Sequence, residues 1–159
     1  MSRAVSLARI LADDRARYAD IAVLPEQEVY CGTVAEAFAE NPARFDLHGI
    51  FEGDVPVGLF KIDRAYHYNI PICARDALGL RAFMIDHAHQ GRGIATAAVR
   101  VMKAHLAAEY PDRPCVDLTV NHRNIAARAC YLKGAFEDTG EDWLEGRAGP
   151  QDLLRMRLR

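Results

Sequence analysis

Apolar residues follow two spacings along this chain, and the spacing changes from one stretch to the next. Short runs that are apolar, or that alternate with polar residues, are typical of strands, whereas apolar residues at every third or fourth position indicate a helix. Strands are predicted at residues 4–10, 45–52, 55–62, 80–85, 116–120, from 135 onward and at 153–158. Helices are predicted at residues 13–22, 34–40, 93–109 and 124–133.

Turn and capping residues separate these elements. Gly53 and Asp54 lie between two strand-like runs, which predicts an antiparallel hairpin. Thr33 can cap the second helix at its start, and Gly134 can cap the fourth at its end. The resulting order, β-α-α-β-β-β-α-β-α-β-β, predicts one α+β domain over residues 1–159 that is built on a single mixed sheet.

The composition excludes several classes of protein. The 159 residues are half hydrophobic and carry a net charge of −2, which suits a globular domain and argues against a globally basic nucleic-acid binder. No apolar run approaches the roughly 20 residues that cross a bilayer. Arg9 and Asp13 interrupt the N-terminal stretch too early for a signal peptide. We therefore expect a cytoplasmic protein without nucleic-acid or membrane partners.

The cysteines argue against a metal or disulfide scaffold. Cys31, Cys73, Cys115 and Cys130 are widely separated and form no C-x-x-C pair. Where no secretory signal is present, this spacing disfavours both a disulfide framework and a zinc site. We expect small buried thiols and no bound metal.

The most informative stretch, residues 83–95, combines a strand end, a glycine-bearing loop and the start of an amphipathic helix. Gly91 and Gly93 allow the backbone to approach a ligand and to adopt positive φ. The N–H groups of the loop and of the first helical turn then form a cradle for phosphate, with Arg92 at its rim. The loop lacks the Lys-Ser/Thr pair of nucleotide hydrolases, and a simple glycine-eased turn is the alternative.

A second motif follows on the helix predicted at 124–133. At 3.6 residues per turn, Asn124, Ala127, Arg128 and Tyr131 share one face. A small residue between an amide and a phenol lets a ligand lie close to the helix. A core-facing tyrosine with a capping asparagine is the alternative.

Together these motifs resemble the GNAT superfamily of N-acetyltransferases. Residues 90–95 match its Q/R-x-x-G-x-G/A signature, with alanine in the last position. Asn124, Ala127 and Tyr131 match its later N-x-x-A-x-x-x-Y-x-x-x-G-F pattern, although Gly134 lies one residue nearer the tyrosine than in that pattern. The resemblance implies the GNAT fold, a central mixed and mostly antiparallel sheet flanked by about four helices.

The resemblance also implies an acetyl-CoA-dependent enzyme. Residues 83–85 would pair with the pantetheine arm, residues 90–96 would hold the pyrophosphate, and Asn124 would contact the pantetheine end. Tyr131 is implied to be the catalytic acid that protonates the departing thiolate. The cofactor-binding residues expected in all are Phe83, Met84, Ile85, Gln90, Gly91, Arg92, Gly93, Ile94, Ala95, Thr96, Asn124, Ala127 and Arg128.

Direct attack of an amine on a thioester expels a thiolate, which a phenol about 3 Å away can protonate. The attacking amine must also lose a proton to a carboxylate, a histidine or a chain of waters. Glu26, Glu28 and His67 are the candidates for this base, and none is favoured over a plain surface role.

Local similarity to the spermine/spermidine acetyltransferase-like branch, at residues 24–30, 55–60 and 81–93, favours a polyamine or another small primary amine as acceptor. A polyamine needs an acidic cleft, for which Glu26 and Glu28 are the expected substrate-binding residues, with Glu52 or Asp63 as further candidates. Alternatives are acetylation of a protein N-terminus, an amino acid or an aminoglycoside-like amine, and a non-catalytic acyl-CoA-binding module. The chain is expected to be a monomer or a homodimer.

Overall fold

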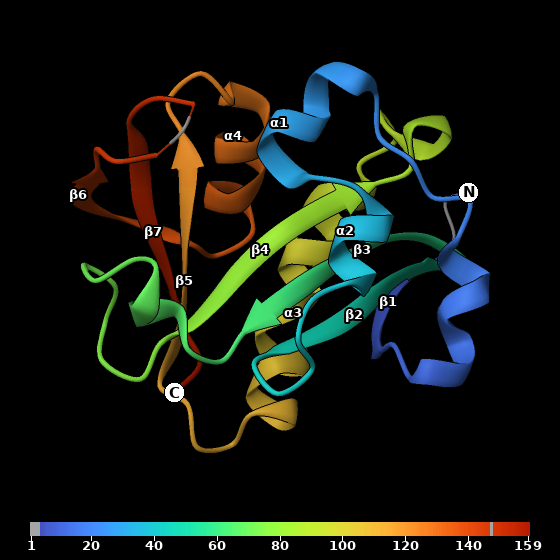
Figure 1. Ribbon diagram of the computed structural model, residues 1–159, viewed down its shortest axis with the longest axis horizontal. Coiled ribbons are helices and arrows are strands. Elements are labelled where there is room, and N and C mark those ends of the chain that lie inside the picture. The colour runs from blue at the N-terminus through green and yellow to red at the C-terminus, as the bar shows by residue number, and fades with distance from the viewer. Residues whose placement is uncertain (1–3, 147) are drawn as a thin grey trace.

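A computed structural model describes residues 4–146 and 148–159 of the chain. The described residues form a seven-stranded sheet in the order β1-β2-β3-β4-β5-β7-β6 (Figure 1). Its strands are β1 (Val5–Arg9), β2 (Phe45–Glu52), β3 (Val55–Asp63), β4 (Leu78–Ile85), β5 (Cys115–Asn121), β6 (Glu137–Trp143) and β7 (Gln151–Arg157). The α-helices are α1 (Glu28–Cys31), α2 (Val34–Phe38), α3 (Ile94–Glu109) and α4 (Ile125–Lys133).

Neighbouring strands are antiparallel except for β4 and β5, which are parallel. This confirms the α+β class and the mixed, mostly antiparallel sheet predicted from the sequence. The predicted hairpin is formed by β2 and β3, which turn at Gly53 and Asp54. The glycine has a φ of +61°, a conformation that costs a residue without a Cβ little.

Helices cover both faces of the sheet. One face packs on α3 and α4 through a large apolar cluster that includes Phe60, Ala98 and Met102. The other face is covered by the N-terminal segment, with α1 and α2, through a smaller cluster around Tyr18 and Leu59. Figure 1 shows α3 behind the sheet and α1 and α2 in front of it. No helix in the described part of the chain is long and apolar enough to cross a membrane.

The helix predicted at residues 13–22 is wrong. The chain there forms a 3₁₀ segment at Ala12–Tyr18 instead. Its last residue, Tyr18, is fully buried against Gly49 of β2, where a Cβ would lie 2.2 Å from the tyrosine hydroxyl. Packing of this ring, and not local helix propensity, decides the path of the segment. The short α1 escaped prediction because one helical turn carries no periodicity.

A buried polar network lies at the far end of α3 from the glycine loop. Tyr110 donates its hydroxyl hydrogen to Asp46 at 2.6 Å, so His48 Nε2–H must donate to the Tyr110 oxygen at 2.9 Å. The other ring nitrogen of His48 then accepts a hydrogen bond from His105 at 2.8 Å. Arg9 and Arg64 neutralise Asp46. The bond accepted from His105 requires His48 to be neutral, because a protonated ring has no free lone pair.

This network predicts acid sensitivity. Burial, and then the neighbouring His105, lower the pKa of His48 from 6.5 to about 3. The unfolded chain therefore binds more protons below pH 6.5, and stability falls as the pH falls. Between pH 7 and pH 5 this single group is expected to remove about 2 kcal/mol from the free energy of unfolding.

Chemical denaturation at the two pH values measures this loss. His48→Gln keeps a donor and an acceptor without titrating, so it is expected to shrink the difference, whereas the exposed His67→Gln is expected to leave it unchanged. An equal pH dependence in wild type and His48→Gln is the contrary result.

Candidate active site

The sheet opens between β4 and β5. These strands are paired only at Leu78 with Val116 and at Gly79 with Asp117, yet both continue beyond these pairs. The facing N–H and C=O groups of residues 80–85 therefore have no strand partner on that edge. Backbone polar groups away from water need partners. The edge of β4 is thus a place where a ligand with amide groups can add itself to the sheet.

A bulge in β4 produces this opening. Arg81 pairs with Lys61 and Met84 with Leu59, so β4 contains one residue more than β3 over this stretch. Ala82 lies in the bulge with a φ of +55°, which is unusual for a residue with a side chain. The bulge bends β4 away from β5 at the carboxyl ends of the two strands, which lie beside α1 and α4 in Figure 1.

The glycine loop lies directly after this end of β4. Gly91 and Gly93 have φ values of +76° and +78°, and a Cβ on either would meet no atom within 4 Å. The glycines therefore do not serve packing; they allow the positive φ and leave the space above the loop open. Gly93 immediately precedes α3, whose first-turn N–H groups lack partners within the helix. This is the geometry of an anion cradle.

The polar side chains of the loop are engaged within the protein. Gln90 and Gln27 exchange amide hydrogen bonds at 2.9 and 3.1 Å, and Gln90 also donates to the carbonyl of Ile85. Arg92 contacts both carboxylate oxygens of Glu52, at 2.9 and 3.1 Å. The side chains thus hold the loop in place, and its backbone N–H groups are what remain for a ligand.

Tyr131 of α4 lies against β4 beside the opening. Its ring packs edge-on against Phe83 of β4, with centroids 5.8 Å apart, and against Phe136 at 5.6 Å. Its hydroxyl makes no hydrogen bond with any described residue, and no buried side-chain oxygen or nitrogen among these residues lacks a partner. The hydroxyl oxygen therefore reaches solvent. Burial raises the pKa of Tyr131, so the phenol stays protonated.

Two other residues of α4 that were expected to bind the cofactor, Ala127 and Arg128, have different surroundings. Ala127 is half buried against the larger core and leaves the helix face beside Tyr131 flat. Arg128 instead forms ion pairs with Asp138 and Asp152 at 2.6 Å each, which directs its guanidinium toward β6 and β7. Asn124 is the residue before the helix, and its side chain makes no cap hydrogen bond.

The remaining expected residues of the loop and of β4 lie where the sequence predicts them. Ile94, Ala95 and Thr96 form the first turn of α3, and the Thr96 hydroxyl contacts the Cys130 sulfur at 3.7 Å. Met84 and Ile85 are buried at the end of β4, with their side chains in the two different cores. Their backbone, and not their side chains, faces the opening.

The structure does not gather an acidic cleft from the expected substrate residues. Glu26 and Glu28 are exposed, at the turn before α1 and at its start, and neither carboxylate has a cationic or hydrogen-bonding partner in the described structure. Asp63 is fully buried and bound by Arg44 at 2.7 Å. Glu52 is held by Arg92. His67 is exposed and stacks near Tyr68.

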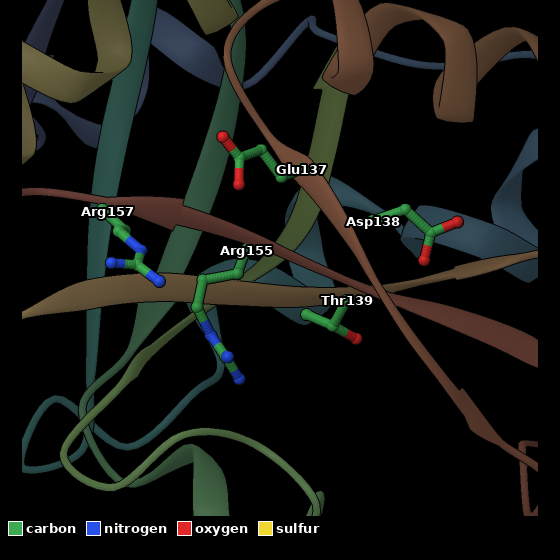
Figure 2. Close-up of a pocket in the computed structure, with 5 residues that line it drawn as sticks. All are labelled: Glu137, Asp138, Thr139, Arg155 and Arg157. Carbon is green, nitrogen blue, oxygen red and sulfur yellow. The ribbon is translucent and has the colours of Figure 1, made fainter.

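Two features were not anticipated. A shallow cavity of about 160 Å³ lies over β6 and β7 and is drawn in Figure 2; it is lined by Glu137, Asp138, Thr139, Arg155 and Arg157. Arg155 is bound there to the buried Asp117. Close by in the sequence, His122, Asp142 and Asp152 bring potential metal ligands within 4.8 Å of one another. Asp152 already pairs with Arg128 and with His122, so its charge is compensated within the protein.

The chain is similar to known acetyltransferases. The acetyltransferase (GNAT) family matches residues 7–136. The uncharacterized N-acetyltransferase YbbJ of Bacillus subtilis (strain 168) is 33% identical over 110 residues, and the match spans 66% of each protein, just under two thirds of the relative's length.

Solved structures share the fold over almost the whole chain. AAC(6')-Ib in complex with Parmomycin and AcetylCoA has a TM-score of 0.74 at 17% identity, covering 97% of this chain and 93% of that one. Spermidine N-acetyltransferase from Vibrio cholerae, in complex with CoA and spermine, has a TM-score of 0.66 at 13% identity, covering 97% and 95%. At these identities the two structures establish the fold alone.

Proposed function

Because the chain belongs to the acetyltransferase (GNAT) family, we propose that it transfers the acetyl group of acetyl-CoA to the nitrogen of a small primary amine. The observation that carries the proposal is Tyr131, whose hydroxyl has a raised pKa and no hydrogen bond to the described residues and whose ring lies against Phe83 of β4, beside the opening between β4 and β5. Mere binding of an acyl-CoA does not need a phenol at that place.

The residues fit the cosubstrate in two independent ways. The unpaired edge of β4 at residues 80–85 presents alternating N–H and C=O groups that suit the amides of a pantetheine arm. The open space above Gly91 and Gly93, at the start of α3, suits a pyrophosphate group. The edge of β4 leads directly to the glycine loop. One extended molecule could therefore lie along the edge with its pantetheine arm and reach the loop with its pyrophosphate.

Each protein group has a distinct task in the proposed reaction. Acetyl-CoA supplies an acetyl thioester, the amine nitrogen forms the new C–N bond, and the C–S bond breaks. Tyr131 gives its proton to the departing sulfur, and a phenol whose pKa is raised is in the right protonation state to do so. The backbone edge of β4 orients the thioester so that attack occurs within one bound complex.

The amine must also release a proton. Asp63 and Asp117 lie on the strands near the opening, but both are fully buried and each is held by an arginine, Arg44 and Arg155 respectively. We therefore assign this proton to water and not to a carboxylate of the sheet. A polyamine acceptor, a class suggested by the spermidine N-acetyltransferase neighbour, would have Glu26 and Glu28 as its substrate-side carboxylates.

The proposal is tested by measuring thiol release from acetyl-CoA, with mass detection of the acetylated product. The panel contains spermidine, spermine, diamines, amino acids, aminoglycosides and short peptides. At least one amine is expected to release thiol and appear as its N-acetyl derivative. Binding of acetyl-CoA without acceptor-dependent thiol release across the panel would instead support a non-catalytic acyl-CoA-binding module.

A further inference from the structure

Arg81 of β4 has hydrogen-bond donors without partners. Its guanidinium makes no hydrogen bond with the residues that the structure describes, and its nearest carboxylate oxygen, on Asp63, is 3.6 Å away. The side chain is 38% exposed. By contrast, Arg44 binds the same aspartate with two hydrogen bonds, at 2.7 and 2.8 Å. Arg44 thus occupies the carboxylate of Asp63, and the guanidinium of Arg81 remains free to bind another anion.

The surroundings of Arg81 are cationic. Arg44, Lys61 and Arg81 gather around the ring of Phe45, with their charged groups 4.9, 5.2 and 5.7 Å from its centroid. Among the described residues, two carboxylates meet these three cations: Asp63, which Arg44 occupies, and Glu40, which lies 3.5 Å from Lys61. Burial and the charge of Arg81 lower the pKa of Lys61, in keeping with an excess of positive charge at this place.

Arg81 also stands next to the proposed reaction centre. It directly precedes the bulge at Ala82 and lies two residues before Phe83, the residue that touches Tyr131. Next to it, Gly79 leaves room for the ring of Tyr66, which a Cβ there would meet at 2.2 Å. Burial raises the pKa of Tyr66 to about 12, and the nearby charge of Arg81 opposes this rise. The Tyr66 hydroxyl lies 3.5 Å from the Thr119 hydroxyl of β5.

We propose that the acceptor is a small amine that also carries a carboxylate, as an amino acid does, and that Arg81 binds this carboxylate. The inference rests on the proposed acetyl transfer and names its substrate class. A guanidinium offers paired N–H donors that match the two oxygens of a carboxylate. With its anionic end on Arg81, the acceptor extends toward the opening, where its amine meets the thioester beside Tyr131.

The same arrangement disfavours a polyamine. A polycation placed over Arg44, Lys61 and Arg81 meets like charge, and the carboxylates among them are already taken. Other amines with an anionic group of similar shape share the recognition chemistry.

The test compares amines that differ only by a carboxylate, namely lysine with cadaverine and phenylalanine with phenethylamine, with spermidine added. In wild type, kcat/KM is expected to be roughly 10- to 100-fold higher for the carboxylated member of each pair. Arg81→Gln is expected to abolish this advantage, mainly through KM, while leaving phenethylamine, which carries no second charged group, unchanged. Arg81→Lys restores part of it, and Arg100→Gln, an exposed change on α3, has no effect.

A second readout separates this inference from the proposed activity. Binding of the same amines is measured by calorimetry on protein saturated with CoA, which has no acetyl group to transfer. Binding of the carboxylated amines that depends on Arg81 supports the inference even if no acceptor turns over. Preference for cadaverine or spermidine, or equal selectivity in wild type and Arg81→Gln, overturns it even if acetyl transfer is confirmed. Failure of all these amines to bind the CoA complex overturns it as well.

Discussion

Tyr131→Phe is expected to lower kcat by about 100-fold or more, with little change in the KM for acetyl-CoA. The substitution removes one oxygen, and that oxygen has no hydrogen-bond partner among the described residues. No hydrogen bond between described residues is therefore lost. What is lost is the proton donor for the departing thiolate. Steady-state kinetics with the best acceptor, together with calorimetric titration of acetyl-CoA, measure the two effects separately.

The matched control is Tyr68→Phe, which removes a hydroxyl from a ring that is 75% exposed, and its kcat is expected to stay at the wild-type value. Because burial raises the pKa of Tyr131, the phenol does not lose its proton below pH 10. Wild-type kcat is therefore not expected to fall between pH 8 and pH 10 through this group. An unchanged kcat in Tyr131→Phe removes the residue from the mechanism.

Gly93→Val is expected to weaken acetyl-CoA binding by about 100-fold or more. The β-branched side chain fills the space where a phosphate would approach, and it resists the φ of +78° that the loop requires. The strain alone costs about 1–2 kcal/mol of stability. Calorimetric titration of acetyl-CoA gives the affinity, and thermal unfolding gives the strain.

Gly140→Val separates strain from binding. Gly140, on β6, also has a positive φ, +82°, and a Cβ there would meet nothing within 4 Å. The two variants are expected to lose similar stability, but only Gly93→Val is expected to lose acetyl-CoA affinity. Equal affinity in both would show that residues 91–93 form an ordinary turn and not a cradle.

Local signals were sufficient for much of the fold. The hairpin of β2 and β3, the long helix α3 and the helix carrying Tyr131 all follow from spacing and from turn residues that lie within the same stretch of sequence. The glycine loop was likewise recognisable, because positions with positive φ favour glycine and these glycines directly precede a helical pattern. These features depend on contacts that are short in sequence.

Features that depend on distant contacts could not be predicted. The opening between β4 and β5 depends on how far two parallel strands stay paired, and no residue pattern states that. The partner of Gln90 is Gln27, and the partners of Arg128 are Asp138 and Asp152, so residues of the recognised motifs turn out to hold the structure together. The role inferred for Arg81 arises because Arg44 already occupies its neighbouring aspartate.

The acidic cleft expected at Glu26 and Glu28 is the weakest of the predictions from sequence. The order of charged residues along the sequence does not reveal which way their side chains point. Both residues are exposed, Glu26 in the turn before α1 and Glu28 at the first position of α1. The cations around Phe45 come from β3, β4 and the segment before β2, so only the folded sheet brings them together.

We propose that acetyl transfer takes place at the opening between β4 and β5. The most direct measurement is a crystal structure of the protein with CoA. The pantetheine arm is expected to run along residues 83–85 of β4, the pyrophosphate to lie over Gly91 and Gly93, and the sulfur to lie within about 3.5 Å of the Tyr131 hydroxyl. CoA bound elsewhere, or with its sulfur far from Tyr131, would contradict the claim.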